Sequence, residues 1–267
     1  MFHTYSIKSL YPIALAEGEG VGTAYEYFTK RLLLERWLQS EKQPATVLVA
    51  GLPEKYGASL DFLLLASEMG AAIMLADDRP QALTKAKAAV SMARQNGHLL
   101  NIEPEYCLTD NMEILAEIDG SFDLVLSSET LQRLAASDRK QYVGRLIQLA
   151  PQVAIFTPNN DNPAHTNISG LSGLRLDELD AVVKQGIEST GGLESQMSRQ
   201  IGYIDMPPFP PGITRTDDQR EQATSGTGEA IAMWGLGYYA HLERWLPLSW
   251  RRSKSHIVFA LINNSQR

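Results

Sequence analysis

Short apolar runs alternate with amphipathic segments through the middle of the chain. The first run, Thr46 to Ala50, is rich in β-branched residues and meets a turn at Gly51. A helical apolar pattern follows, and a second buried run from Ala71 to Ala76 ends in Asp77-Asp78. The order strand, turn, helix, strand, acid is typical of half of a nucleotide-binding unit, in which backbone N–H groups and a strand-tip carboxylate face the ligand.

The same alternation continues to about residue 190. Further apolar runs predict strands at 102–108, 124–126 and 152–157, and amphipathic segments predict helices at 81–95, 138–149 and 177–189. Pro80 suits the first turn of its helix, and Asn96-Gly97 is a typical helix end. We therefore expect an α/β fold with a doubly wound, mostly parallel sheet that is covered by helices on both faces.

The two ends of the chain depart from this alternation. Residues 1–43 are expected to form an N-terminal helical cap around one amphipathic helix, Thr23 to Gln39, whose apolar stripe contains Tyr27, Leu34 and Leu38, with Lys30, Arg31 and Glu35 interspersed. Glycine-rich Ala16 to Gly22 is interpreted as a flexible lead-in to this helix or as a hinge. Residues 44–267 would form the main domain, with an insertion at about 207–255 before a final alternating strand, His256 to Ile262.

Composition narrows the class of protein. At 267 residues, with 44% hydrophobic and 21% charged positions, the chain has an ordinary composition for a soluble globular protein. Its net charge of −7 argues against nucleic acid as a partner, and its one cysteine, Cys107, excludes an internal disulfide. No apolar run is long enough for a transmembrane segment, no signal peptide is evident and no metal-ligand spacing is present. We expect a cytoplasmic protein without a bound metal.

The turn after the first strand discriminates between nucleotide cofactors. A dinucleotide-binding fold expects G-x-G-x-x-G at this point, but Gly51 is followed by Leu52-Pro53-Glu54-Lys55-Tyr56 before Gly57. The glycine that lets a pyrophosphate approach is missing, and Glu54 would place a negative charge beside it. A nicotinamide-dependent oxidoreductase is therefore disfavoured. S-adenosyl-L-methionine, an adenosine without a pyrophosphate, fits this turn better.

The order of elements, with SFDLVLSSETLQRL (Ser121 to Leu134) at the fourth strand, resembles the class I S-adenosylmethionine-dependent methyltransferases. The resemblance covers roughly residues 45–190 and the final strand. It implies a Rossmann-like sheet with an antiparallel last strand, S-adenosyl-L-methionine as cofactor and S-adenosyl-L-homocysteine as product. The first motif departs from the family, because Val49 stands where the family usually carries an acid.

The resemblance also implies a set of cofactor-binding residues. Asp77, in a D-x-x-P match, would bind the ribose hydroxyls, with Asp78 as its neighbour, and Asp110 would meet the adenine amino group. Glu54 or backbone carbonyls would meet the amino group of the methionine part. The remaining positions would line the pocket: Gly51, Leu52 and Pro53 in the turn, Thr109 and Asn111 by the adenine, and Ser127, Ser128 and Glu129 on the methionine side.

Two segments are candidates for the methyl acceptor. TPNNDNPAHTNISGL (Thr157 to Leu171) follows the fifth strand at the edge of the sheet where ligands bind. His165 is the first candidate for a general base, with Asn159 and Asn160 beside it and Asp161 and Asn162 as acceptor contacts. The alternative is an Asx-rich turn whose side chains satisfy their own backbone. Tyr25 and Tyr27 are further acceptor-binding candidates, although core packing is favoured for Tyr27.

The predicted function is direct in-line methyl transfer to a small-molecule oxygen or nitrogen acceptor. The lack of N-P-P-[YFW] after the fourth strand disfavours DNA amino groups as acceptors. The alternative is a catalytically silent S-adenosylmethionine- or nucleotide-binding homologue or partner subunit. The aromatic and basic segment Trp245 to Lys254 offers peripheral membrane or lipid contact, but a packed helix with a solvated turn is favoured. A homodimer is one option for the assembly.

Overall fold

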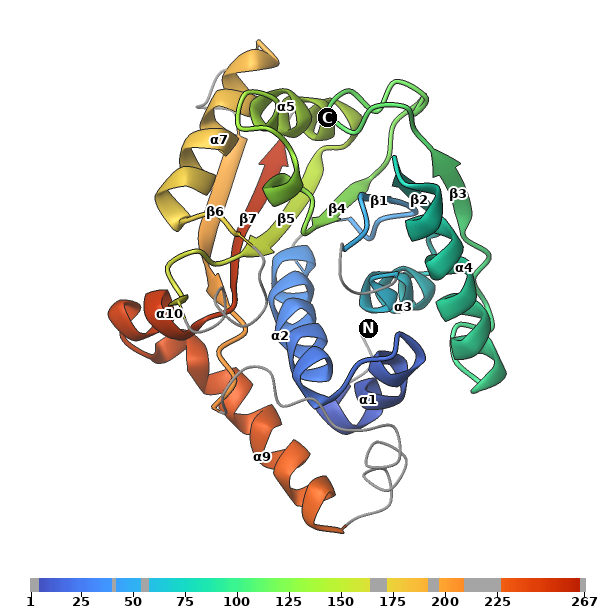
Figure 1. Cartoon of the computed structure of the whole chain (residues 1–267), viewed down its shortest axis with the longest axis vertical. Coiled ribbons are helices and arrows are strands. Elements are labelled where there is room, and N and C mark those ends of the chain that lie inside the picture. The colour runs from blue at the N-terminus through green and yellow to red at the C-terminus, as the bar shows by residue number, and fades with distance from the viewer. Residues whose placement is uncertain are drawn as a thin grey trace.

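In the described part of the chain, seven strands form one mixed sheet in the order β3-β2-β1-β4-β5-β7-β6 (Figure 1). The computed structural model describes residues 5–39, 42–53, 58–163, 172–191, 197–208 and 227–264, with the backbone alone for 227–232. The parallel strands are β1 (Thr46–Ala50), β2 (Ala72–Asp77), β3 (Glu105–Leu108), β4 (Leu124–Ser128) and β5 (Gln152–Pro158). The last strand, β7 (Ile257–Asn264), runs antiparallel between β5 and β6 (Met197–Ile204). The predicted α/β fold with an antiparallel last strand is confirmed.

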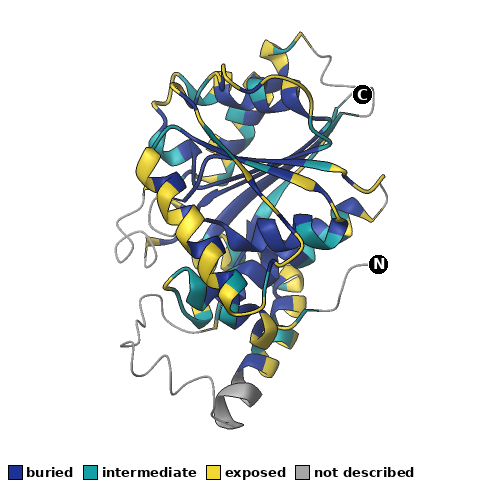
Figure 2. Cartoon of the chain, turned by 90° about the vertical axis from the view of Figure 1, so that its right-hand side faces the viewer, coloured by how far each residue is buried: buried dark blue, intermediate teal, exposed yellow. Residues whose placement is uncertain are grey.

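Helices cover both faces of this sheet, and Figure 2 shows the buried strands between the helical layers. One layer contains α3 (Leu60–Met69) and α4 (Pro80–Gln95), and the other contains α5 (Arg139–Leu149) and α7 (Leu176–Ser189). Successive residues of a strand face opposite sides of a sheet. Val47 and Val49 therefore join the core under α3 and α4, whereas Leu48 and Ala50 join the core under α5 and α7.

The N-terminal region contains two helices, α1 (Ile7–Ala16) and α2 (Val21–Leu38), of which the sequence pattern indicated only the second. The side chain of Ser6 caps α1, and Pro12 lies inside it, which obscures the helical signal. The glycine-rich segment is a tight link between the helices, with Gly18 at φ 79° and Gly20 as the N-cap of α2. Both helices bury apolar side chains in the core that contains α3.

The region between β6 and β7 carries α9 (Thr227–Leu242), the 3-10 turn η3 (Glu243–Trp245) and α10 (Leu248–Lys254). α9 packs against α1 and α2, and α10 contacts β6. In Figure 1, α2 lies beside the carboxyl ends of the central parallel strands, with α9 outside it. Within the described ranges, no helix is both long and apolar enough to cross a membrane.

One strand is shorter than the pattern indicates. The predicted run from Ile102 to Leu108 is a strand from Glu105 onward, directly after Pro104, which has no N–H to give to a ladder. Before it, the Ile102 carbonyl accepts a hydrogen bond from the Arg94 side chain instead of a strand partner.

Candidate functional site

The turn after β1 is tied to the tip of β2 by two hydrogen bonds. The N–H of Gly51, whose φ is 80°, donates to the Ala76 carbonyl at 2.8 Å. The N–H of Leu52 donates to Oδ2 of Asp77 at 2.7 Å. The predicted turn and the predicted acid therefore lie together at the carboxyl edge of the sheet, where ligands of such sheets bind.

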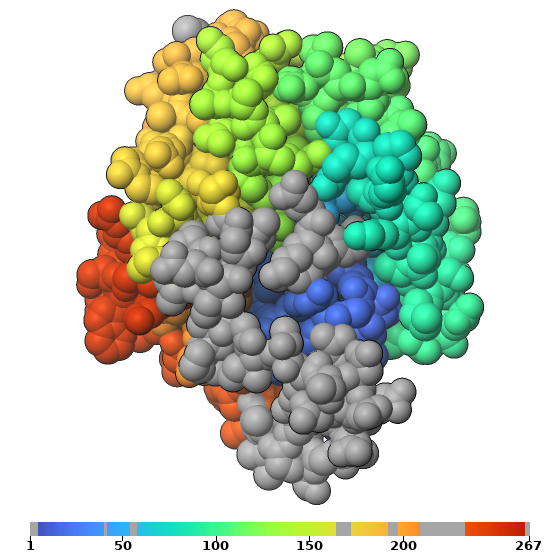
Figure 3. All heavy atoms as spheres, in the orientation of Figure 1, coloured from blue at the N-terminus to red at the C-terminus, as the bar shows by residue number. Residues whose placement is uncertain are grey.

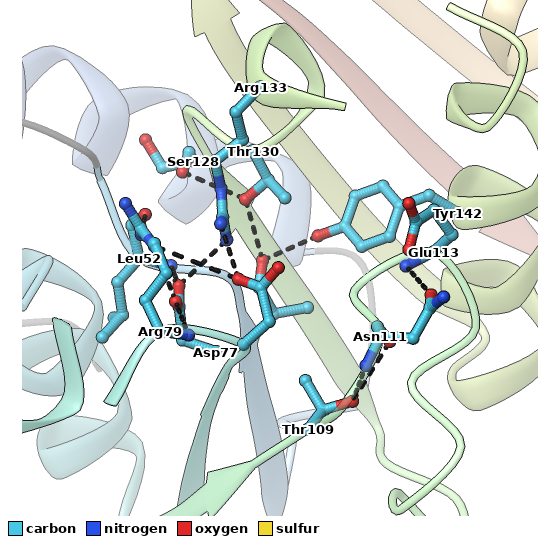
Figure 4. Close-up of polar contacts among 12 residues, drawn as sticks. Leu52, Asp77, Arg79, Thr109, Asn111, Glu113, Ser128, Thr130, Arg133 and Tyr142 are labelled. Atoms are coloured by element: carbon cyan, nitrogen blue, oxygen red, sulfur yellow. Dashed lines mark hydrogen bonds and ion pairs between the residues drawn. The ribbon is translucent and has the colours of Figure 1, made fainter. Parts of the chain in front are cut away.

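Two arginines converge on the buried Asp77 carboxylate (Figure 4). Oδ1 accepts hydrogen bonds from the Arg79 backbone at 2.9 Å and from its Nε at 2.8 Å. Oδ2 lies 3.0 Å from a terminal nitrogen of Arg79 and 3.0 Å from one of Arg133, a residue of the 3-10 turn η1 (Leu131–Arg133). A second nitrogen of Arg133 bonds Asp78 at 2.6 Å. Both carboxylates at the tip of β2 are thus paired with arginine.

The arginines keep Asp77 ionised. Burial opposes its charge, but hydrogen bonds from Arg79 and the positive charge of Arg133 outweigh this effect and hold the pKa of Asp77 below its ordinary value. A ribose hydroxyl that donates to Asp77 would have to replace one of these guanidinium contacts. The sequence indicated neither arginine as part of the site, although Arg79 lies inside the D-D-R-P segment and Arg133 inside SETLQRL.

The side chain of Thr130 packs directly against Gly51. A Cβ atom at Gly51 would lie 2.1 Å from Oγ1 of Thr130, so no larger residue fits without movement. The Ala50 carbonyl accepts hydrogen bonds from Thr130 at 3.3 Å and from the Tyr142 hydroxyl at 2.7 Å. Ser127, expected on the methionine side, is buried and shares a 2.8 Å hydrogen bond with Tyr142. These contacts fix the positions of the strand tips.

The segment after β3, for which we predict adenine contacts, lies next to Asp77. The N–H of Thr109 donates to the Asp77 carbonyl at 3.1 Å, and its hydroxyl bonds Glu117. Asn111 accepts from the Glu113 N–H at 2.9 Å and so closes a local turn. Asp110 is exposed. Asn111 is exposed as well, whereas Thr109 is buried.

A second group of charges lies between α2 and the tip of β4. Lys30 of α2 is 2% exposed; its Nζ donates to Oγ of Ser128 at 3.1 Å and pairs with Glu26. The same Nζ lies 5.4 Å from the ring centroid of Phe62 and 5.5 Å from that of Phe156. Burial lowers the pKa of Lys30, but the surrounding carboxylates, Glu26 first, raise it above its ordinary value. Lys30 is therefore a buried permanent cation.

Asp61, in the first turn of α3, faces this cation without the hydrogen bonds that Asp77 receives. It is 6% exposed, and within the described part of the chain neither of its carboxylate oxygens has a hydrogen-bond partner. Burial raises the pKa of Asp61 to about 7, and the charges of Glu26 and Glu17 add to the effect while Lys30 opposes it. Asp61 can therefore exchange a proton near neutral pH.

Glu129 completes this group at the end of β4. It is buried with φ at 57°, and its N–H donates to the Phe156 carbonyl at 2.9 Å. Its charge contributes to the raised pKa of Lys30. Ser128 and Glu129, both predicted from the resemblance, thus lie beside Lys30, for which the sequence pattern predicted no role in the site.

A third polar cluster joins α2 to η3 and the start of β7. Tyr25 is buried and donates to Glu243 at 2.8 Å, and Glu243 also accepts from the backbone of Asp205 at 3.2 Å. Nδ1 of His256 lies 3.1 Å from Oδ2 of Asp205. Burial raises the pKa of Glu243 to about 7. Burial lowers the pKa of His256, but the negative charge of Asp205 raises it, and the result lies above the ordinary value. Tyr27 is in the core, as favoured, with its hydroxyl on Glu17.

The described part of the loop after β5 holds the region before β7 in place. The side-chain amide of Asn159 donates to the carbonyls of Arg252 and Ser255, both at 2.8 Å, and that of Asn162 donates to Lys254 at 3.0 Å. Asp161 pairs with Arg252 at 3.0 Å. Asn160 is exposed, and its N–H donates to the Leu174 carbonyl at 3.1 Å. These three side chains therefore bind a distant segment, and one local contact, from the Asp161 N–H to Oδ1 of Asn159 at 3.0 Å, is of the kind that the turn interpretation expects.

Two of the predicted site residues, Glu54 and His165, lie outside the described residues, while Leu52 and Pro53 are buried beside Gly51. Lys30 and Asp61 were missed, but a signal existed for the first. Tyr27, Lys30 and Leu34 are separated by three and four residues, so Lys30 lies on the apolar stripe itself. A charge on that stripe indicates a buried, paired cation.

No family model matches this sequence, and no curated protein matches it. Solved structures do resemble it. The plantazolicin methyltransferase BamL, in complex with a triazolic desmethylPZN analogue and SAH, is 12% identical with a TM-score of 0.51, over 96% of this chain and 85% of BamL. A SAM-dependent methyltransferase from Archaeoglobus fulgidus is 14% identical with a TM-score of 0.52, over 90% of this chain and 94% of that one.

The methyltransferase domain of the bacterial protein CtHen1-C is 13% identical with a TM-score of 0.51, over 88% of this chain and 97% of that domain. The strand order and the antiparallel β7 agree with these likenesses. The chain has the class I methyltransferase fold. Asp77 and Ser128, the hydrogen-bond partner of Lys30, end β2 and β4, the strands on either side of β1.

Proposed function

We propose that this protein transfers a methyl group from S-adenosyl-L-methionine to an oxygen or nitrogen atom of a small-molecule acceptor. The observation that carries the proposal is Asp77: an ionised carboxylate at the tip of β2, hydrogen-bonded to the turn at Gly51. This is where a class I methyltransferase fold needs an acceptor for ribose hydroxyls. Gly51, Leu52 and Asp77 would hold the nucleoside, with Asp110 near the adenine.

The Lys30–Asp61 group would serve the acceptor side. When bound, S-adenosyl-L-methionine supplies an electrophilic methyl group. An alcohol or a protonated amine must lose a proton before or during its reaction, and Asp61, with a pKa of about 7, would take that proton. Lys30, held on Ser128 and Glu26, would keep a positive charge beside it. His165 remains our proposal for a second proton acceptor, with Asn160 as an acceptor contact.

A catalytically silent S-adenosylmethionine- or nucleotide-binding protein is the second candidate function. The contacts of Arg79 and Arg133 with Asp77 favour it, because they compete with a ribose for the same carboxylate oxygens. The absence of an acid at Val49 in β1 also favours it, since the family usually carries one there.

Calorimetry with S-adenosyl-L-homocysteine and with NAD tests the cofactor class. We expect the first to bind and the second not to bind. Asp77→Asn should weaken S-adenosyl-L-homocysteine binding by about 1–3 kcal/mol, the scale of charge-assisted hydrogen bonds. Asp119→Asn, at an exposed acid, is the matched control and should bind as the wild type does.

An unchanged affinity of Asp77→Asn would remove Asp77 from the site and the proposal with it. A separate experiment measures turnover of the wild type, as formation of S-adenosyl-L-homocysteine from S-adenosyl-L-methionine with a panel of alcohols, phenols and amines. Binding without turnover on any of them would favour the second candidate.

A further inference from the structure

In the part of α9 whose side chains are described, residues 233–242, apolar residues lie on two sides of the helix, and one of these sides is packed. Met233 and Ala240 are buried in the core, and Leu236 and Tyr239 pack against it. On the other side Trp234, Tyr238 and Leu242 are 65%, 59% and 59% exposed. These three residues are spaced four apart, so they share one face of the helix. A surface helix normally carries polar residues there.

The exposed apolar surface continues past the end of α9. Trp245 in η3 is 73% exposed, and Leu248 and Trp250 in α10 are 64% and 60% exposed. Three of the four tryptophans of the chain are therefore largely exposed on consecutive elements. These elements form the lower left margin of the molecule in Figure 1, and Figure 3 shows the α10 segment, in red, at its outer left edge. We refer to Trp234, Tyr238, Leu242, Trp245, Leu248 and Trp250 as the aromatic margin.

Positive charge accompanies the aromatic margin. Residues 233–254 contain four basic residues and one acid, Glu243, which is buried. The segment thus has a formal charge of +3, whereas the rest of this chain of net charge −7 sums to −10. The Arg244 guanidinium lies 4.8 Å from the Trp245 ring centroid, and Arg244 and Lys254 are both exposed. Arg252 is exposed too, but it pairs with Asp161.

We propose that the aromatic margin docks on an anionic lipid surface. Tryptophan and tyrosine are amphipathic rings that favour the headgroup level of a bilayer, and nearby basic side chains add attraction to anionic lipids. A second copy of the chain is a poorer occupant. In a two-fold dimer the same surface meets itself, so two surfaces of net positive charge would be brought together. A cluster of large exposed apolar residues on consecutive elements indicates an interaction surface.

Helix α2 contacts the elements that carry the aromatic margin, and the same helix carries Lys30. Tyr25 of α2 donates to Glu243, which directly follows α9. Lys30 lies on the same helix, a little more than one turn further on. Docking at α9 and α10 would therefore place the edge of the sheet that carries the candidate site close to the lipid surface. The proposal stands on the exposed residues and does not depend on the cofactor.

Tryptophan fluorescence and vesicle flotation of the full chain test the proposal. Vesicles of phosphatidylcholine mixed with phosphatidylglycerol should shift the emission to shorter wavelength and carry the protein upward. Vesicles of phosphatidylcholine alone should do so weakly, and added salt should reduce binding. Arg244→Gln with Lys254→Gln should weaken partitioning roughly fivefold for each charge removed.

The aromatic variant Trp245→Ala with Trp250→Ala should lose vesicle binding by roughly tenfold or more. Leu100→Ala with Leu108→Ala is the control, since these residues are 67% and 50% exposed on another part of the surface. No shift and no flotation of the wild type would overturn the proposal, as would an equal loss in the control. A dimer that the aromatic variant converts to a monomer, without vesicle binding, would instead assign the surface to a second copy.

Discussion

Two buried aspartates at the same edge of the sheet have pKa values that are shifted in opposite directions. Asp77 receives hydrogen bonds from Leu52, Arg79 and Arg133, and its pKa lies below the ordinary value. Asp61 receives none on its carboxylate oxygens from the described residues, and its pKa is raised to about 7. Burial acts in the same direction on both. The donors and the charges around each carboxylate decide which one stays ionised.

This difference separates two roles. A carboxylate that stays ionised is suited to accept hydrogen bonds from a bound sugar over a wide pH range. One that titrates near neutrality is suited to move a proton. The Asp77 group is therefore interpreted as a binding site and the Lys30–Asp61 group as a site for proton transfer, and the following substitutions probe this contrast.

The largest effect is expected from Gly51→Ala, which disturbs the turn that positions Asp77. The new Cβ would meet Oγ1 of Thr130 at 2.1 Å, and the φ of 80° disfavours any side chain. We expect a loss of about 2–4 kcal/mol in the free energy of unfolding, measured by chemical denaturation.

Gly70→Ala is the matched control for this substitution. Gly70 also has a positive φ, 66°, but no atom lies within 4 Å of its Cβ position, so the loss should be only about 1 kcal/mol. Adding Thr130→Ala to Gly51→Ala should restore part of the stability. Equal losses at the two glycines would show that Thr130 does not constrain the turn.

A smaller effect, distinguished by its pH dependence, is expected from Asp61→Asn. The folded pKa of about 7 lies above the ordinary 3.8, so protonation of Asp61 stabilises the wild type fully below pH 3.8. That contribution disappears as the pH rises through 7. Between about pH 4 and pH 7, the free energy of unfolding of the variant should therefore rise relative to that of the wild type. At pH 8 the difference should be about 1–3 kcal/mol in favour of the variant. Its turnover should fall.

Asp77→Asn should show the opposite pH dependence. Its folded pKa is depressed, so its charge stabilises the wild type above the ordinary pKa of 3.8, and that contribution is lost on acidification below it. The advantage of the wild type over this variant should be full at neutral pH and shrink in acid. Urea unfolding at several pH values measures both variants. The same pH dependence for the two would contradict the opposite pKa shifts of Asp61 and Asp77.

The smallest effect concerns Arg133, which contacts Asp77 from outside β2. Arg133→Met removes one competitor for the Asp77 carboxylate, so S-adenosyl-L-homocysteine should bind more tightly by about 1 kcal/mol in calorimetry. Lys140→Met, at an exposed lysine of α5, should leave the affinity unchanged. Weaker binding by Arg133→Met would show that Arg133 itself holds the ligand.

The local elements were largely predictable from the sequence. β1 matches its predicted bounds, and α4 begins at Pro80 and ends before Gly97. These elements can be predicted because strand and helix periodicities and capping residues are local signals in the sequence. The pattern did not predict α1, because Pro12 lies inside this helix. The predicted strand at 102–108 begins three residues later, at Glu105, because Pro104 cannot donate to a ladder.

The site was predictable only in part, for a physical reason. The positions of Gly51 and Asp77 follow from the order of strands, because the carboxyl ends of parallel strands meet at one edge. The partners of Asp77 and Lys30 come from distant elements: Arg133 reaches Asp77 across 56 positions, and Lys30 reaches Ser128 across 98. A linear pattern carries no information about such pairs.

The sequence by itself determined the alternating strands and helices of the central region, the mostly parallel sheet that they form, and the position of the acid at the tip of β2. Only the tertiary structure decided which carboxylate keeps its charge, which residues pair with Lys30, and which side of α9 is exposed. The reason is that acid strength and exposure depend on the donors, charges and surfaces that surround a side chain in space. Those surroundings are assembled from residues far apart along the chain.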